Sequence, residues 1–301
     1  MRFEDQIISF KPKSLAEDPD KMGGLLEKAK DSDKKRPDMY SFKDIYDEKE
    51  IIEDDVKVKK LKKKWNEENN KYFKFMRDFS TVYETAVMDI LDKNKFLGEN
   101  NEIIPASEYD DIFNGIDGVL IIHQDNLENE YVGLNFDVTF SSTDKNIEEK
   151  IESIKQCIRE GVLPTLKYFQ DPKTKEHKKI SLPKIIIGSQ QSSADGLVRL
   201  WGKSDENNSE KLKNHPVQSK IIVEALSQLG YFYDFAKNLA EKTREDDKRE
   251  KYNDICIKYQ KMHRYFYNIY LAKKDLIESH YNEIINDTVY QEIIKLTREK
   301  K

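Results

Sequence analysis

The stretch Ser107–Ser142, SEYDDIFNGIDGVLIIHQDNLENEYVGLNFDVTFSS, decides the fold of this chain. It predicts two β-strands, because runs rich in Val, Ile and Phe flank a polar segment that can turn. The first strand runs from Asp117 to about His123 and the second from Tyr131 to about Ser141, with the turn at 124–130. Successive side chains of a strand point to opposite faces, so the second strand has an apolar face and a polar face. The apolar face carries Leu134, Phe136, Val138 and Phe140, and the polar face carries Asn135, Asp137, Thr139 and Ser141.

Asp117 and Asp137 are expected to face one another. A hairpin that folds symmetrically about Leu127 makes them a cross-strand pair, with Cβ atoms roughly 4.5–5.5 Å apart. Val119 and Ile121 share that face of the first strand, so the face is expected to be partly covered. Neighbouring carboxylates repel, and a covered pair needs a cation between them. The alternative is the solvent-facing side of an ordinary amphipathic hairpin.

The composition predicts one main core with helical additions. The chain has 301 residues, of which 37% are hydrophobic, 11% aromatic and 36% charged. A chain of this length can bury a full core. The formal net charge is -5, which gives no general attraction to nucleic acid, so any such binding must come from a local patch.

Several other classes of protein are disfavoured. Cys157 and Cys256 fall within helical patterns and predict neither a disulfide framework nor a zinc site. The histidines have no zinc-ligand spacing, and the P-loop and G-x-S-x-G motifs are absent. The first residues lack the apolar core of a signal peptide, and no apolar run reaches membrane-spanning length. We therefore expect a cytoplasmic protein without membrane contact.

Charge and periodicity divide the chain into three regions. Residues 1–64 predict a charged, loosely ordered segment, 65–202 an α/β core, and 203–301 a helical C-terminal region. The first region ends in six lysines within eight positions: Lys57, Lys59, Lys60, Lys62, Lys63 and Lys64. Such a run can contact phosphates, and the alternative is a solvated helix face balanced by Glu53, Asp54 and Asp55.

The core is expected to be a mixed sheet with helices. Apolar spacing predicts a helix from Trp65 to about Asn94 and another that carries Ile147 to Ile158 and stops at Gly161. A strand, a helix and a further strand in this order imply a right-handed crossover. Further expectations are a loop at 98–105, a strand at 165–169, a charged loop at 170–181, a buried strand at 184–188, a helix at 194–201 and a polar link at 203–214. From Pro216 onward the chain is expected to be helical, with aromatic stripes that pack on the core or contact a protein partner or a second copy.

The order of helix, acid-bearing hairpin, helix and strand over about 65–189 resembles the core of the PD-(D/E)XK nuclease superfamily. In that family an acid near the start of one strand is followed, on the next strand, by an acid, any residue and a lysine. Here these places hold Asp117, Asp137, Val138 and Thr139. The resemblance implies a restriction-endonuclease-like mixed sheet flanked by helices, and hydrolysis of phosphodiester bonds in DNA. By order along the chain, it also makes Glu84 the counterpart of the family's first-helix glutamate.

Thr139 stands where the family has lysine, and a threonine cannot supply a cation. In the superfamily the lysine can be displaced to the helix that follows. Asp137 lies about five residues before the predicted strand end, or ~16 Å. A helix returning from about position 145 at ~1.5 Å per residue draws level after about eleven residues. This spacing predicts Lys155, whereas Lys150 is only half as far along, and the alternative is that both are ordinary flanking charges.

Together these residues predict a magnesium or manganese site. Carboxylate-bound Mg²⁺ polarises a phosphoryl oxygen and lowers the pKa of bound water. Asp117 and Asp137 are the expected ligands and catalytic acids, Glu84 or Glu108 is the expected third oxygen donor, and Lys155 is the expected electrostatic partner.

The neighbouring acids Asp110 and Asp111 can help hold a second ion, or can serve as capping and turn residues. Two functions are therefore kept open. One is a metal-dependent nuclease acting on DNA, and the other is an inactive nuclease-fold module that binds nucleic acid or protein.

Overall fold

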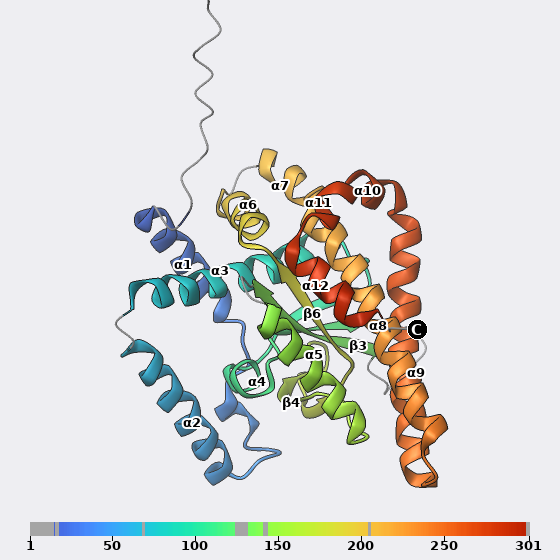
Figure 1. Cartoon of the computed structure of the whole chain (residues 1–301). Helices are drawn as coiled ribbons and strands as arrows, with labels where there is room; N and C mark the ends of the chain where they lie inside the picture. Colours follow the sequence, from blue (N-terminus) through green and yellow to red (C-terminus); the bar gives the residue numbers. More distant parts are fainter. Residues whose placement is uncertain are drawn as a thin grey trace, which may run out of the picture.

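The structure is a computed structural model, and it describes residues 15, 18–67, 70–123, 132–140, 144–203 and 206–298. It is a mixed α/β structure in which helices surround a four-stranded sheet (Figure 1). The predicted turn at 124–130 and the end of the second predicted strand, at Ser141, lie outside the described residues.

The sheet has the order β1-β2-β3-β6. Its strands are β1 (Asn101–Pro105), β2 (Gly118–Ile122), β3 (Val132–Phe140) and β6 (Lys184–Ser189). β2 is antiparallel to both β1 and β3, and β6 runs parallel to β3. Gly118 pairs with Phe136, so the residues just outside this pair, Asp117 and Asp137, lie across from one another as predicted.

Apolar side chains cover both faces of this sheet. On one face, α3 (Lys71–Lys93) packs against β3, with the ring centroids of Phe79 and Phe140 4.8 Å apart. The other face is covered by α5 (Asp144–Arg159), α12 (Thr288–Thr297) and a two-stranded sheet of β4 (Thr165–Gln170) and β5 (His177–Ser181). In Figure 1, α5 and α12 lie in front of the strands. Every residue of β3 is buried, which confirms that the polar face of the hairpin is covered.

The free edge of β6 is closed by α8 (Pro216–Lys242). Gln228 Nε2 donates to the carbonyl of Ile186 at 2.7 Å, and the Ile186 N–H donates to Gln228 Oε1 at 2.8 Å. One turn away, the Gly188 N–H donates to Glu224 Oε2 at 3.2 Å. Side chains of a helix thus take the hydrogen bonds that another strand would make.

The described part of the N-terminal region is helical, which differs from the loosely ordered segment that its charge predicts. It contains α1 (Pro19–Asp33), the 3₁₀ helix η2 (Met39–Phe42) and α2 (Glu48–Asn66). Leu25 and Ala29 of α1 belong to the main core, which also contains Val87 and Ile221. The prediction failed because a few apolar residues, spaced to face the core, bury a helix whose other side chains are charged.

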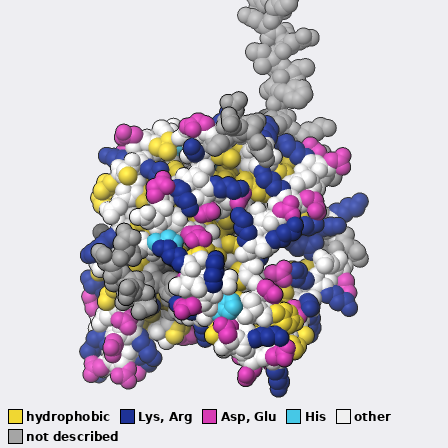
Figure 2. All heavy atoms as spheres, turned by 180° about the vertical axis from the view of Figure 1, so that it is seen from behind, with side chains coloured by type: hydrophobic (Ala, Val, Ile, Leu, Met, Phe, Trp, Pro, Cys, Tyr) yellow, Lys and Arg dark blue, Asp and Glu magenta, His cyan; other side chains and the backbone are white. Residues whose placement is uncertain are grey.

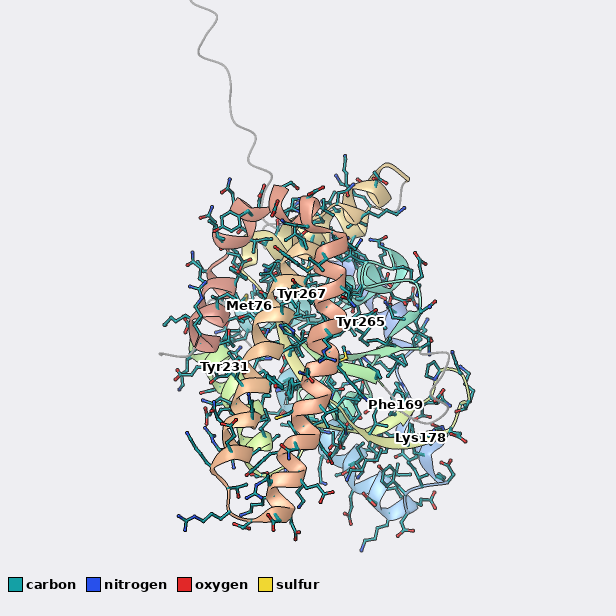
Figure 3. All side chains as sticks on the ribbon, turned by 90° about the vertical axis from the view of Figure 1, so that its right-hand side faces the viewer. Met76, Phe169, Lys178, Tyr231, Tyr265 and Tyr267 are labelled. Atoms are coloured by element: carbon teal, nitrogen blue, oxygen red, sulfur yellow. The ribbon has the colours of Figure 1, made fainter. Side chains whose placement is uncertain are left out.

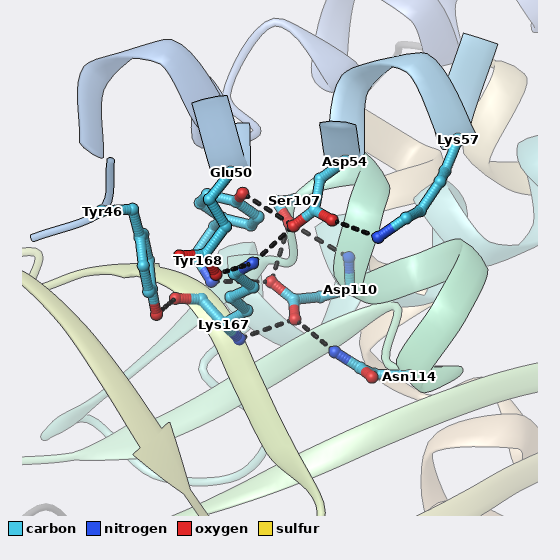
Figure 4. A network of polar contacts seen from close by, with 9 residues as sticks. All are labelled: Tyr46, Glu50, Asp54, Lys57, Ser107, Asp110, Asn114, Lys167 and Tyr168. Carbon is cyan, nitrogen blue, oxygen red and sulfur yellow. Dashed lines mark hydrogen bonds and ion pairs between the residues drawn. The ribbon is translucent and has the colours of Figure 1, made fainter. Parts of the chain in front are cut away.

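A polar network fixes α2 to β4 (Figure 4). Asp54 Oδ2 accepts hydrogen bonds from Lys167 Nζ at 2.5 Å and from the Tyr168 hydroxyl at 3.0 Å. Below it, Asp110 of α4 (Glu108–Asn114) accepts from the backbone N–H groups of Lys167 and Tyr168 at 2.7 and 3.0 Å. Ser107 caps α4 through the Asp110 N–H, so Asp110 has the capping and structural role that was one of its two interpretations.

The remaining helices form the C-terminal region, as predicted. Short helices α6 (Gln191–Gly202) and α7 (Glu206–Lys213) lead to α8, which packs along α9 (Asp246–Ala272), and α10 (Lys274–Ser279) and α11 (Tyr281–Ile285) precede α12. Figure 3 shows α8 and α9 side by side, with Tyr265 pointing from α9 toward the chain before β1. There its hydroxyl donates to the Leu97 carbonyl. Among the described residues, no helix is long and apolar enough to cross a membrane.

Candidate active site

Two buried aspartates meet at the point where β2 begins. Asp117 is 8% exposed and Asp137 is 3% exposed. The Val138 N–H donates to Asp117 Oδ2 at 2.5 Å, and the Asp117 N–H donates to the Phe136 carbonyl at 2.8 Å. The backbone of β3 therefore holds Asp117 beside Asp137, while the second carboxylate oxygen of Asp117 has no hydrogen bond to a described residue.

Asp137 lies between two lysines. Lys150 of α5 donates to Asp137 Oδ1, and Lys184 at the start of β6 contacts Asp137 Oδ2 at 3.0 Å. Lys184 also donates to the Asn114 carbonyl at 3.3 Å. Gly115 makes this approach possible, because a Cβ at its left-handed φ of 57° would lie 3.1 Å from Lys184 Nζ and 3.3 Å from Asp137 Oδ2.

The lysine of the following helix that contacts Asp137 is Lys150, and the expected Lys155 does not reach it. Lys155 pairs with Glu152 at 2.9 Å and lies over the ring of Phe235. The described strand ends at Phe140, three residues after Asp137 or ~10 Å, and α5 begins at Asp144. Six helical residues, ~9 Å, then draw level with Asp137, which places Lys150 there. The prediction set the strand end too late and so overshot by more than one helical turn.

Glu84 extends toward the same group of acids from the middle of α3. Its Oε1 accepts a hydrogen bond from the Ser80 hydroxyl at 2.6 Å. A small cleft of about 50 Å³ borders both Glu84 and Asp117, and it is also lined by Arg36 and Met88. Two of the predicted acids therefore share one opening to solvent.

Glu108 and Asp111 have partners of their own. Glu108 lies at the surface in an ion pair with Lys62 at 2.6 Å. Asp111 pairs with Arg36 at 2.8 Å. The structure thus brings Glu84, rather than Glu108, to Asp117.

The acids of this group differ in their affinity for protons. Burial raises the pKa of Asp117 well above its ordinary value, and the negative charges of Glu84, Asp111 and Asp137 raise it further. Burial and then Asp111 raise the pKa of Glu84 to about 7. Burial acts in the same direction on Asp137, but Lys184 and Lys150 outweigh it, so the pKa of Asp137 is lowered. The Lys150 pKa is raised, because the charges of Asp137 and Asp117 exceed the effect of its burial.

Of the three acids that meet here, Asp117 and Glu84 fit a site for a divalent cation, whereas Asp137 does not. Asp117 and Glu84 repel in a covered place and retain oxygens for a ligand, as a cation site requires. Each oxygen of Asp137 contacts a lysine, so this carboxylate can bind a metal ion only after Lys150 or Lys184 has moved away from its oxygen. Within the described ranges, no group of three or more His, Cys, Asp or Glu side chains is arranged to hold a metal ion.

Comparisons with protein-family models, with curated proteins and with solved structures give no match to this chain.

Proposed function

We propose that this chain is a metal-dependent nuclease of the restriction-endonuclease-like fold that hydrolyses phosphodiester bonds in DNA. The observation that carries the proposal is the meeting of Asp117, Asp137 and Lys150 on a β-hairpin and the helix that follows it. The four-stranded sheet supports the same proposal, since α3 precedes β1, β2 and β3, α5 follows β3, and β6 returns parallel to β3; α4 and the β4–β5 hairpin are inserted between these elements.

In this proposal, Asp117, Glu84 and one oxygen of Asp137 hold Mg²⁺ or Mn²⁺. The ion, when bound, would polarise the phosphoryl group and acidify a water molecule. Lys150 takes the role first expected of Lys155, since its ammonium group lies at the acids and can stabilise negative charge on a phosphate. Lys184 holds the other oxygen of Asp137 and orients that carboxylate.

One observation favours the alternative of a binding module without catalysis. Lys150 and Lys184 neutralise Asp137, so the buried carboxylate is stable without a bound metal ion. The cleavage experiment below decides between the two functions.

The test is Asp117→Asn, assayed for cleavage of single-stranded and duplex DNA with Mg²⁺ and with Mn²⁺. Asparagine keeps an acceptor for the Val138 N–H and removes a buried charge, so the variant is expected to keep or raise the melting temperature. We expect cleavage to fall by ~10²-fold or more, the usual loss when one group that acts on the reacting phosphate is removed. Equal cleavage by the variant would refute the proposal, and the absence of metal-dependent cleavage by the wild type would favour the binding module.

A further inference from the structure

A group of exposed aromatic and basic side chains lies where α2 ends and α3 begins. Trp65, Tyr72 and Phe73 are 41%, 59% and 58% exposed. A groove between the two helices is lined by Lys64, Trp65, Phe73, Lys74 and Arg77. We call these residues, together with Tyr72, the α2–α3 corner.

Two of the basic residues of this corner, Lys64 and Lys74, differ from the earlier lysines of the run in having no ion pair with a described residue. Lys57 and Lys59 pair with Asp54 and Asp55 at 2.9 and 2.6 Å, so that part of the run is the balanced helix face. The third basic residue, Arg77, lies 3.7 Å from the carboxylate of Asp78. Figure 2 shows Lys and Arg side chains gathered at the right-hand edge, the side where α2 and α3 lie after the half-turn from Figure 1.

The α2–α3 corner is connected to the candidate active site by one face of α3. Phe73, Arg77, Ser80 and Glu84 follow one another at steps of four, three and four, which puts them on the same side of the helix. Glu84 lies eleven positions after Phe73, or ~16 Å along the helix axis. Exposure falls along this face, from the open ring of Phe73 to half-buried Glu84. A chain lying along this face would pass from the aromatic rings to the acids.

The helices that carry the α2–α3 corner are held in place by hydrogen bonds. α2 is fixed to β4 through Asp54, Lys167 and Tyr168 (Figure 4), and the Trp65 carbonyl accepts a hydrogen bond from Arg77 at 2.7 Å. Rings held on rigid helices lose little conformational freedom when a flat ligand stacks on them. Base stacking on aromatic rings and phosphate contact by lysine and arginine together are typical of sites for single-stranded nucleic acid.

We infer that the α2–α3 corner binds unpaired bases of single-stranded DNA and guides the strand along α3 to the acids. This inference rests on the proposed nuclease function for its destination, while binding itself is independent of cleavage. In duplex DNA the bases are stacked on each other, so their faces cannot reach Trp65 or Phe73. The inferred substrate therefore has a single-stranded segment.

The test measures binding without a divalent metal, so that cleavage does not enter. A fluorescein-labelled oligothymidylate of about twenty nucleotides, longer than a typical site for one such domain, is titrated in EDTA and followed by anisotropy. The chain has two tryptophans, and Trp201 is 4% exposed, so Trp65 reports on the corner through quenching of its emission. We expect quenching by the oligonucleotide and much weaker binding of a blunt duplex.

Matched variants locate the contact. Phe73→Ala and Trp65→Ala are each expected to weaken binding by ~10-fold, the loss typical of one stacked base. Lys64→Gln and Lys74→Gln are expected to weaken binding and to reduce its dependence on salt. Tyr281→Ala, which removes a ring that is 61% exposed at another place, and Lys242→Gln are the controls and should bind like the wild type.

Three results would overturn the inference: no binding of the oligonucleotide by the wild type, equal binding by the corner variants, or equal affinity for the blunt duplex without quenching. Asp117→Asn separates this inference from the proposed function. If it binds the oligonucleotide normally but does not cleave, both stand, and if the wild type binds in this way but never cleaves, only the nuclease proposal fails.

Discussion

Asp117 and Asp137 lie across the same pair of strands, yet their surroundings act on them in opposite directions. Asp137 has a lysine on each oxygen, and its pKa is lowered. Asp117 forms no ion pair within the described part of the chain. Burial together with three neighbouring carboxylates raises its pKa, and the positive charge of Lys150 offsets this only in part. Asp137 is therefore held ionised, whereas ionised Asp117 would be stabilised by a further positive charge beside it.

Metal binding is expected to strengthen with pH through the titration of Glu84. The pKa of Glu84 is raised to about 7, so below that pH the carboxyl must release a proton before it can bind a cation. Affinity should fall by up to about tenfold for each pH unit below about 7 and level off above it. Titration calorimetry with Mn²⁺ between about pH 6 and 8 measures this dependence.

Glu84→Gln and Glu108→Gln form a matched pair for that measurement. The first should weaken metal binding and remove the step near neutral pH, because it removes a ligand that titrates there. The second changes a surface acid paired with Lys62 and should leave the titration unaltered. An unchanged titration in Glu84→Gln would exclude Glu84 as a ligand.

Lys150→Met and Lys155→Met separate the two candidate lysines. Lys150 lies on Asp137, so its loss should lower metal-dependent cleavage by ~10²-fold or more. Lys155 is paired with Glu152 and lies over Phe235, so its loss should change cleavage less than about threefold, the effect of a surface charge. Single-turnover cleavage rates check both, and a larger loss in Lys155→Met would contradict the assignment of Lys150.

Glu224→Gln is expected to make the protein less sensitive to alkaline pH. Burial raises the pKa of Glu224 from 4.5 to about 8, so between these values the folded state binds more protons at this site than the unfolded state. Stability from this group is therefore complete below about pH 4.5 and declines by up to roughly 1.4 kcal/mol per pH unit until about pH 8. Glutamine keeps an acceptor for the Gly188 N–H without this loss.

The free energy of unfolding in urea, measured for both proteins at about pH 5, 7 and 8.5, checks this expectation. The difference in favour of Glu224→Gln should grow with pH. Glu241→Gln, at an exposed position of α8, is the control and should follow the wild type. A difference that stays constant with pH would show that Glu224 does not titrate in this range.

The sequence predicts the elements whose pattern is local. The hairpin, its register, α5, β4 and β6 follow from alternation and helical spacing, and the structure confirms them. Loops were predicted where β1 and β5 lie, because Gly98, Asn100, Asn101 and Pro105 are typical of a loop and 170–181 is rich in charge. α4 and α7 were missed because they are short and polar; α4 is stabilised by its Ser107 cap, and α7 packs against α6.

The site depends on contacts that local patterns do not contain. Asp137 and Lys184 are far apart in the sequence and meet only because β6 pairs in parallel with β3. The sequence signal for Lys184 is its place at the start of an otherwise apolar strand, because a buried cation needs an acid nearby. To predict Lys150 rather than Lys155, the last residue of β3 must be known to within two positions, and side-chain alternation does not define a strand end that closely.

Gln228 makes α8 a substitute for a missing neighbour strand. A fragment of the chain that stops before α8 would leave the N–H and carbonyl groups of Ile186 and the N–H of Gly188 without these partners along an apolar strand. Such bare strands stick to one another and start aggregates. We therefore expect a fragment that carries the sheet and the candidate active site, but lacks α8, to aggregate.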